Sequence, residues 1–590
     1  MTDLYLNGVL VDLSTEVSIK MIQENTYFTK SSSYTYNISL PLRSKTNQIV
    51  FGHINRADVA KRAVTFNATL ISQGQTLLRG TATITELKDE TVEIQLLSGN
   101  SEFNFFTRSE GVYIDEMDLG EQPTSLFYYY TENNFKSLYT PTYPNGNGCL
   151  CPVYNSTDSK IYNDMKPVIH TDDVSRYYLL GTFPGYTRVC AQPYLCYVIK
   201  KVIEVLGYTL SQNDIENTVF KNLYICSTKV SNKYADALPH WKANDFFTYL
   251  ENFMGVITLV DEGTKQVRIL FAKNFFDKEQ TVTLNNVSDE LSASIDEDET
   301  RTITDGNIGY DISGWGEMAF VRLSDEVLAA ATINTYDTYA LMQQAIAGMT
   351  YDQKKKIIFE TEGRRYIWMK EDTNEYLKEV DQYRNLIRLP DKKDLDVELK
   401  IVPVEIIETE IDLLRAKSAF MDVSVTTELI GKVMVQMPVL AGSSFASDYA
   451  NQVALQDLIE DTVEQEETVD LMQVAFFNVY KGITANSVNH FFPVPFTDCR
   501  SGLFSDLPQW SLRFYGSATE TYLGHEVYTG LAEINSPVEE TKIVISRKKF
   551  DPKAVYIINN KRYVCKKIEM TVTATGPAPT QRFILYELLE

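Results

Sequence analysis

The chain has 590 residues, 44% of them hydrophobic and 23% charged, so its composition is globular and its length predicts several domains. With 79 acidic and 55 basic residues, its formal net charge of -24 would repel a polyphosphate backbone, which argues against specific nucleic-acid binding. No long apolar run is present, so we expect no membrane span.

The N-terminal sequence MTDLYLNGVLVDLS has neither a basic region nor an apolar stretch, so we expect no secretory signal peptide and synthesis in a cytosol. The cysteines follow no recognisable disulfide framework, and we expect buried free thiols. They are Cys149, Cys151, Cys190, Cys196, Cys226, Cys499 and Cys565.

The chain begins with alternating apolar and polar residues around Asn7-Gly8, a dipeptide that suits a tight hairpin turn. Similar alternation recurs in residues 33–42, 63–72, 76–87 and 91–99. Several short strands separated by turn residues predict a small antiparallel barrel or sandwich over roughly the first hundred residues.

Residues 106–185 show little periodicity and are interpreted as a loop-rich insertion. Next, residues 193–208 have apolar residues at helical spacing, with Pro193 near the start and Gly207 at the end, and predict a helix. In residues 238–276, Asn244 or Asp245 is expected to cap a short helix, and a hairpin is expected around residues 261–264.

Residues 301–420 mix strand patterns with helical patterns at residues 325–334 and 338–348. Residues 457–470 are expected to form an acidic linker or solvated helix. The last 120 residues return to strands, including residues 520–530 and a hairpin at Asn559-Asn560.

The sequence therefore predicts a β-rich α+β multidomain protein, in which barrel-like antiparallel β domains carry an inserted helix-plus-hairpin α+β domain. The predicted units are an N-terminal β-barrel domain (1–105), an inserted loop-rich subdomain (106–185), an α+β helix-hairpin domain (186–300), a second β domain with a helical insertion (301–455), and an acidic linker with a C-terminal β domain (456–590).

Sequence patterns for common enzymes are missing: we find no phosphate loop, nucleophile elbow, HExxH or dinucleotide fingerprint in a usable context. Cys149, Cys151, Cys190, Cys196 and His170 are the one group of soft ligands, and their spacing matches no zinc module. We expect a non-enzyme without catalytic residues, cofactor or metal, in which isolated histidines are hydrogen-bonded structural residues.

Aromatic residues are the remaining candidates for a functional surface. Candidate subunit or receptor contacts are Tyr128, Tyr129, Tyr130, Phe491, Phe492 and Phe496. Such residues can form subunit contacts, carbohydrate platforms or core, and the large area that aromatic rings bury favours core or interface.

Segments at both ends and in the middle of the chain resemble tail proteins of phages and prophages of Bacteroides and relatives. LYLNGVLVDLS (4–14), residues 31–56 and FDPKAVYIINNKRYVCKKIEMTVT (550–573) carry the resemblance at the ends. Residues 193–208 and 238–269 resemble the helix-plus-hairpin modules of tail-tip or baseplate hub proteins.

The resemblance implies a structural virion protein that forms a ring, with a trimer favoured over a hexamer, and contacts tube, distal tail, fibre or spike proteins. It also implies a place in the virion tail, after synthesis in the bacterial host cytoplasm, and a part in the DNA exit channel. Alternatives are a distal tail or fibre-bearing adaptor ring, a host-glycan-binding receptor-recognition protein, and a surface protein of the bacterium itself, which the missing signal peptide disfavours.

Overall fold

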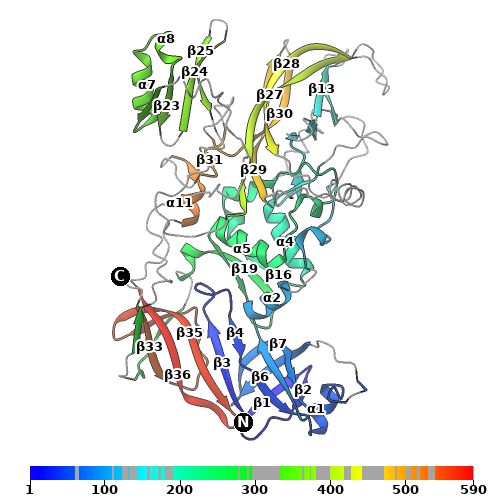
Figure 1. Ribbon diagram of the computed structural model, residues 1–590, viewed down its shortest axis with the longest axis vertical. Coiled ribbons are helices and arrows are strands. Elements are labelled where there is room, and N and C mark those ends of the chain that lie inside the picture. Colours follow the sequence, from blue (N-terminus) through cyan, green and yellow to red (C-terminus); the bar gives the residue numbers. More distant parts are fainter. Residues whose placement is uncertain are drawn as a thin grey trace, which may run out of the picture.

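Strands from the two ends of the chain form one 14-stranded sheet in the computed structural model of the protein (Figure 1). The structure describes residues 1–56, 58–59, 65–108, 112–122, 130–131, 143–155, 160–163, 165–169, 175–179, 190–276, 280–288, 292–295, 332–361, 364–371, 374–380, 399–416, 427–440, 471–485, 488–499, 507–513, 519–528 and 538–588. The predicted β-rich, multidomain α+β architecture is confirmed.

The N-terminal β domain contains β1 (Thr2–Leu6), β2 (Val9–Val11), β3 (Ser18–Glu24), β4 (Ser33–Thr35), β5 (Ile38–Pro41), α1 (Lys45–Val50), β6 (Thr65–Ser72), β7 (Gln75–Leu87) and β8 (Thr91–Leu97). Asn7 and Gly8 have φ angles of 48° and 80°, the left-handed values that the predicted β1–β2 turn requires. Alternate residues of these strands face a common apolar core that includes Leu4, Leu70 and Ile94.

The C-terminal β domain contains β20 (Thr281–Thr283), β21 (Ser292–Ile295), β33 (Val538–Ile545), β34 (Val555–Ile558), β35 (Lys561–Thr573) and β36 (Gly576–Glu587). Asn559 and Asn560 have φ angles of 50° and 64°, which confirms the predicted β34–β35 hairpin turn. The domain is joined to the N-terminal one by antiparallel pairing of β3 with β35, from Ser18 opposite Thr573 to Glu24 opposite Lys567.

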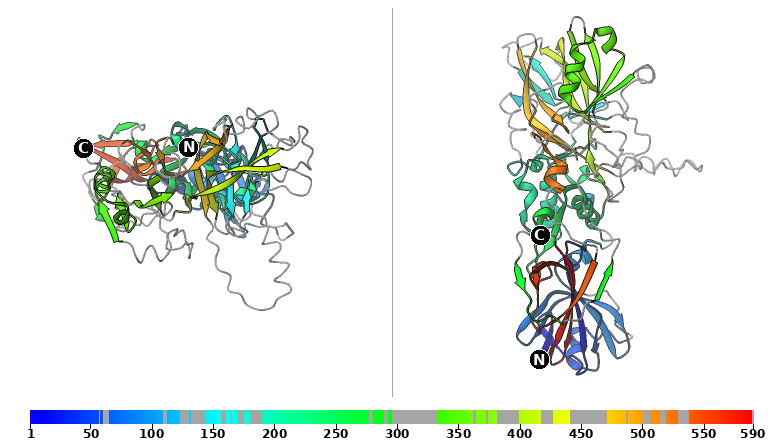
Figure 2. Two further views of the ribbon diagram at one scale, coloured as in Figure 1. Left: turned by 90° about the horizontal axis from the view of Figure 1, so that it is seen from above. Right: turned by 90° about the vertical axis from the view of Figure 1, so that its left-hand side faces the viewer.

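The full sheet has the order β2-β1-β6-β7-β8-β4-β3-β35-β36-β33-β21, with β5 on β8, β34 on β35 and β20 on β34. Both chain ends therefore lie in the lower part of the elongated molecule (Figures 1 and 2). The intervening residues form the central domain and two lobes beyond it.

The central domain is built around two amphipathic helices, α4 (Leu195–Val205) and α5 (Ala243–Met254). Its other helical segments are α2 (Asn100–Thr107), η1 (Ile114–Glu116), η2 (Asp214–Asn217), η3 (Val219–Asn222), η4 (Ala235–Ala237), η5 (Ala272–Asn274) and α11 (Leu523–Tyr528). Its strands are β10 (Gly148–Cys149), β15 (Gln192–Pro193), β16 (Thr209–Asn213), β17 (Tyr224–Ile225), β18 (Val256–Val260), β19 (Gln266–Phe271), β26 (Ile401–Pro403), β29 (Met472–Ala485), β30 (Val488–Phe496), β31 (Trp510–Ser511) and β32 (Thr521–Tyr522).

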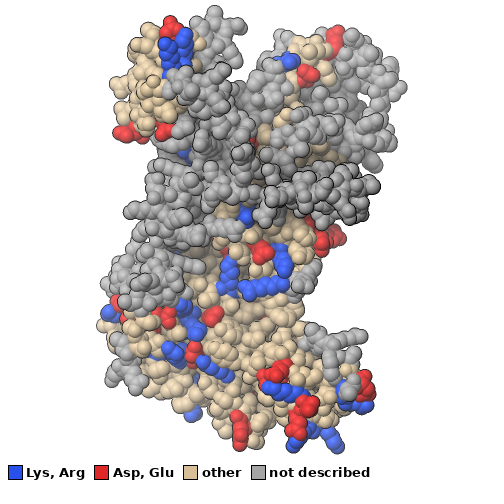
Figure 3. Space-filling model, viewed as in Figure 1, with Lys and Arg blue, Asp and Glu red and all other residues tan. Residues whose placement is uncertain are grey.

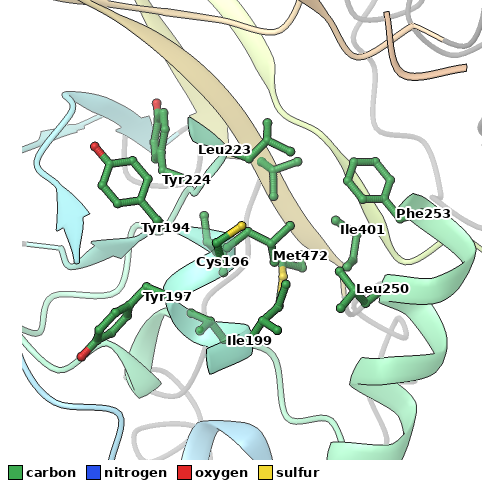
Figure 4. Packing of buried hydrophobic residues seen from close by; sticks show 14 of the residues in the cluster. Tyr194, Cys196, Tyr197, Ile199, Leu223, Tyr224, Leu250, Phe253, Ile401 and Met472 are labelled. Atoms are coloured by element: carbon green, nitrogen blue, oxygen red, sulfur yellow. The ribbon is translucent and has the colours of Figure 1, made fainter. Parts of the chain in front are cut away.

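Helical spacing of apolar residues explains α4, as the sequence predicts. Leu195, Val198, Ile199 and Val202 follow one another at intervals of three or four residues and are fully buried. The helix ends before Gly207, whose φ of 81° is a left-handed terminating conformation. Figure 4 shows α4 packed with α5 and with Ile401 and Met472 from β26 and β29, which the sequence places far from either helix.

The first lobe is a seven-stranded sheet with the order β12-β11-β28-β27-β13-β14-β9. Its strands are β9 (Tyr130–Thr131), β11 (Val153–Asn155), β12 (Lys160–Tyr162), β13 (Met165–Ile169), β14 (Ser175–Leu179), β27 (Glu405–Ala416) and β28 (Thr427–Leu440). Strands from residues 106–185 and 301–455 thus share one sheet, whereas the sequence-based division separates them.

The second lobe is a four-stranded sheet with helices between its first two, parallel strands. It contains β22 (Thr332–Tyr336), α7 (Tyr339–Ala347), α8 (Tyr351–Lys354), β23 (Ile357–Thr361), β24 (Arg364–Glu371) and β25 (Asn374–Val380). Met342 and Ile346 of α7 pack on Phe359 and Tyr366 of the sheet in a small core of their own. The helix expected near residues 338–348 is confirmed by α7.

Three local predictions are wrong. The helix expected over residues 325–334 is contradicted at residues 332–334, which lie in strand β22, and residues 325–331 lie outside the described residues. Helix α5 is preceded by Lys242 as its N-cap residue, so neither Asn244 nor Asp245 caps it, and no side chain supplies a cap hydrogen bond. Residues 520–530 were expected to form a strand, but Leu523–Tyr528 is helix α11. Leu523 and Val527 explain this difference, because residues four apart share a helix face and both are fully buried.

Candidate functional site at the junction of three domains

The tip of the β18–β19 hairpin lies where the N-terminal, central and C-terminal domains meet. The predicted hairpin is confirmed by antiparallel pairing from Val256 opposite Phe271 to Val260 opposite Val267. Gly263 at its tip has a φ of 71°, and a Cβ there would lie 2.7 Å from the Arg79 side chain of β7. Glycine therefore suits both the turn conformation and the close approach of the two domains.

Glu262, beside that glycine, connects both terminal domains to the hairpin. One of its carboxylate oxygens accepts a hydrogen bond from Ser33 of β4. The other lies 2.6 Å from Nζ of Lys549, in the loop between β33 and β34. The carboxylate thus links three segments that are far apart in sequence.

Buried asparagines reinforce the junction on both sides of Glu262. Asn25 is fully buried and donates from Nδ2 to the carbonyl oxygens of Pro552 (3.0 Å) and Cys565 (2.8 Å). Asn100 accepts a hydrogen bond from Val260 N at 2.9 Å and donates to Thr258 O at 2.5 Å. Its amide therefore satisfies backbone groups of β18 as a neighbouring strand would.

Apolar packing completes the contact between the hairpin and the C-terminal domain. Ile257, Leu259 and Leu270 share a cluster with residues directly after η5 and with residues of β34, β35 and the region of β36. The additional buried members are Phe275, Phe276, Val555, Val564, Tyr586 and Leu588. A fully buried large apolar side chain contributes roughly 1.5–3 kcal/mol relative to an exposed one, so this cluster holds the two domains together.

A polar cavity of about 360 Å³ lies at the same junction. Its lining combines carboxylates, two lysines and uncharged polar groups with the backbone of both loops. The lining residues are Gln23, Glu24, Thr26, Ser32, Ser33, Gln75, Asn100, Leu259, Val260, Asp261, Glu262, Lys549, Phe550, Asp551, Pro552 and Lys553. A cavity of this size and polarity can hold several water molecules.

Glu102 is a buried carboxyl group on α2, which leads from the N-terminal domain into the central one. It is 7% exposed and accepts a hydrogen bond of 2.6 Å from Thr81 Oγ1. Burial raises the pKa of Glu102, and the hydrogen bond from Thr81 and the charge of Lys265 oppose the rise only in part.

The aromatic residues singled out from the sequence do not gather at this junction. Phe492 is 3% exposed and Phe496 is fully buried, so both belong to the core and their assignment as subunit or receptor contacts is corrected. Tyr130 and Phe491 lie in β9 and β30, with side chains outside the described part of the structure. Tyr128 and Tyr129 lie outside the described residues altogether.

The predicted burial of free thiols is confirmed for all seven cysteines. Burial raises the pKa of Cys149, and its neighbour Cys151 raises it further. His170 lies outside the described residues. A buried, protonated thiol is a poor nucleophile and metal ligand, so these side chains act as small apolar residues.

His240 is a hydrogen-bonded structural residue, as expected for isolated histidines. Its Nδ1 lies 3.0 Å from a carboxylate oxygen of Asp115, and its ring stacks on Tyr113 with centroids 4.0 Å apart. No helix in the described part of the chain is long and apolar enough to cross a membrane.

Sequence reasoning recognised the hairpin at residues 261–264 but did not single out Glu262, Asn25 or Lys549. Asp261, Glu262 and Gly263 indicate the hairpin in the sequence, because residues of these types predict where the chain reverses direction. The partners of Glu262 come from residues 33 and 549, and no local pattern indicates that they meet.

The fold and the junction define a β-rich α+β protein of several domains, in which the terminal strands form one sheet and the middle of the chain extends from it. No protein-family model matches the chain, and no curated protein matches its sequence.

Two solved structures align with nearly the whole chain. One is the 43 kDa tail protein of prophage MuSo2 from Shewanella oneidensis, with 5% identity, a TM-score of 0.26, and coverage of 99% of this chain and 97% of that one. The other is the tail protein from Neisseria meningitidis MC58, with 6% identity, a TM-score of 0.25, and coverage of 99% and 95%. At this degree of overlap, neither similarity establishes a shared fold or function.

Proposed function

We propose that the chain is a structural component of a phage tail and forms the hub ring that joins the tail tube to the tip or baseplate. The carrying observation is that the end segments resembling tail proteins lie close together in the fold. Strands β4, from residues 31–56, and β35, from residues 550–573, both pair with β3. The resemblance at the two ends thus belongs to one continuous structural unit.

This unit suits a ring-forming protein. It joins two β domains edge to edge, and its sheet ends in β2 at one side and β21 at the other among the described strands. Strand edges and the surfaces beside them must be covered or protected in a stable protein, and neighbouring subunits can cover them. In Figure 1 the central domain and the lobes extend from this double β domain, so in the proposed ring they would project from it.

We also propose that the role is structural and not enzymatic. The polar side chains at the three-domain junction bind one another and the backbone: Glu262 binds Ser33 and Lys549, and Asn25 binds two carbonyl groups. A catalytic acid or base must instead reach a substrate proton. Proposed partners are further copies of the chain and tube, distal tail, fibre or spike proteins, in a virion tail assembled inside the bacterial host.

The test is electron microscopy of the purified chain, with class averages that reveal ring symmetry, and gold-labelled antibody against the chain on intact virions. We expect a threefold ring and label at the tail tip. A sixfold ring would overturn the hub assignment and support a distal tail or fibre-adaptor ring. Virions without label would overturn the tail assignment.

A glycan array and a polysaccharide-depolymerisation assay test the non-enzymatic proposal separately. We expect no turnover. Turnover that disappears on substitution of a single Asp or Glu would contradict a purely structural role.

A further inference from the structure

Charge is distributed unevenly between the terminal β domains and the middle of the chain. Residues 1–108 contain ten Lys or Arg and ten Asp or Glu, and residues 538–588 contain ten basic and five acidic residues. Residues 109–537 contain 35 basic and 63 acidic residues. The excess of acidic over basic residues therefore lies in the middle of the chain. The N-terminal β domain has equal numbers of both, and residues 538–588 of the C-terminal one are basic.

A basic cluster lies on one face of the sheet at the seam between the two terminal domains. Glu569 of β35 is 3.5 Å from Nζ of Lys20 on β3 and 2.9 Å from Nζ of Lys567. Arg582 of β36 stands directly opposite Glu569 in the strand register. Glu24 of β3 stands opposite Lys567 in the register. Three cations thus face two carboxylates, and the group has a surplus of one positive charge.

This seam cluster, defined as these five charged residues, is accessible to a partner. Arg582 is exposed, and the side chain of Lys20 is 47% exposed. Nζ of Lys20 lies 5.1 Å from the ring centre of Tyr36, which is itself 50% exposed. Arginine and tyrosine are enriched where proteins contact one another.

The turn between β7 and β8 carries the complementary charge. Glu86, Asp89, Glu90 and Glu93 lie in or beside this turn, together with Lys88. Lys88 pairs with Glu86 and Glu93, and Arg43 pairs with Glu90. Four carboxylates with two cations leave a surplus of two negative charges.

The two groups lie on different parts of the double β domain. Strands β4 and β3 separate β8 from β35 in the sheet order, and the turn is at the end of β8 that pairs with β5 and not with β4. In Figure 3, blue side chains interspersed with red ones lie over the C-terminal domain at lower left, and red and blue side chains also mix over the N-terminal domain at lower right. Such an arrangement suits a head-to-tail contact between identical subunits, which closes into a ring when the rotation allows.

We propose that the seam cluster of one copy docks on the acidic β7–β8 turn of a second copy. This inference rests on the proposed ring and names the surfaces that would form it. A protein partner fits better than nucleic acid, because a surplus of one charge neutralises about one phosphate, while nucleic-acid binding commonly uses many more. The chain itself supplies a surface of opposite charge.

The experiment compares the wild type with Lys20→Glu/Arg582→Glu by size-exclusion chromatography with light scattering, in 50 mM and 500 mM salt. We expect the wild-type oligomer to dissociate at least tenfold more readily in the higher salt, because exposed charge pairs are screened. We expect the double variant to dissociate at least tenfold more readily than wild type in the lower salt. Circular dichroism verifies that each variant is folded.

A charge-swapped protein makes the test specific. Adding Asp89→Lys/Glu90→Lys to the double variant should restore assembly, because it exchanges the signs of both surfaces. Lys355→Glu, in the second lobe, is the control for the same type of charge change and should assemble as wild type does.

Distinct outcomes separate this proposal from the ring itself. The proposed docking surfaces would be overturned if the oligomer stayed assembled in high salt and in the double variant, or if the charge swap failed to restore assembly. Either result would leave the proposal of a ring standing. A wild-type chain that is monomeric at every concentration and salt would overturn both. Binding of a DNA duplex that the double variant loses would identify the seam cluster as a polyanion site instead.

Discussion

Replacing Asn25, the residue after β3, with alanine should loosen the loop around residues 550–553, which then keeps the 3.0 Å hydrogen bond from Gln23 Nε2 of β3 to Phe550 O. The substitution removes both donors from the buried carbonyl oxygens of Pro552 and Cys565. A buried polar group left without its partner costs about 1–3 kcal/mol, so for two carbonyl groups we expect local opening to become easier by about 2–6 kcal/mol. Since about 1.4 kcal/mol corresponds to a tenfold change, amide exchange there should accelerate about 30-fold to 20,000-fold.

Hydrogen exchange with mass spectrometry is the appropriate assay, because a chain with several separate cores does not unfold in a single transition. Peptides covering residues 550–558 report the joint, and peptides covering residues 339–354 report a distant core. Asn37→Ala is the matched control, since Asn37 is exposed and its side chain contacts Glu93 at the surface. Acceleration below tenfold at residues 550–558, or equal acceleration in the control, would refute the reasoning.

Two further substitutions test the domain connections. Glu102→Gln should stabilise the folded chain at pH 7–8. Burial raises the pKa of Glu102, so its carboxyl group contributes to folding stability below its unfolded pKa, and this contribution is lost as pH rises through the folded pKa. The uncharged amide of Gln carries no such loss. The gain, measured as the midpoint of thermal unfolding of the N-terminal and central domains, should shrink toward pH 4; a gain independent of pH would contradict the assignment. Gly255→Ala should cost about 2–4 kcal/mol of local stability, measured by hydrogen exchange of peptides that cover α5 and β18, because φ is 55° and the new Cβ would lie 2.3 Å from Cγ1 of Val527. Gly207→Ala, with φ of 81° and open space around the site, should cost only about 1 kcal/mol, and equal costs would show that the contact with Val527 is unimportant.

Turns and amphipathic helices were predictable because their causes lie within a few residues. Asn7-Gly8 and Asn559-Asn560 adopt the positive φ angles that their hairpins need, and α4 follows from its apolar spacing. These features depend on local sterics and on one buried face.

Pairing between distant segments was not predictable in the same way. The alternation in β3 and β35 indicates strands, but a strand pattern does not specify which other strand is the partner. The same limit explains why residues 106–185 and 301–455 were separated, although β11 pairs with β28 and β13 with β27. Asn25 and Glu262 acquire their roles through these distant pairings.

Burial of aromatic rings in β30 shows a further limit. Residues 490–496 (HFFPVPF) contain two prolines and resemble a loop, yet they form a strand in which Phe492 and Phe496 are buried. Proline is accepted at a strand position where no ladder hydrogen bond is required of it. The sequence therefore favoured core for these rings without indicating the strand that buries them.

The pairing of β3 with β35 also constrains the order in which the chain can fold during synthesis. Glu24 leaves the ribosome about 540 residues before its partner Lys567. At about 5–20 residues per second, the edge of β3 waits about half a minute to two minutes for the strand that covers it. During that time the central domain and both lobes are synthesised, so the N-terminal β domain must stay soluble with one edge open. A truncated chain that ends before β35 would keep this edge exposed permanently, and we expect truncation there to promote aggregation.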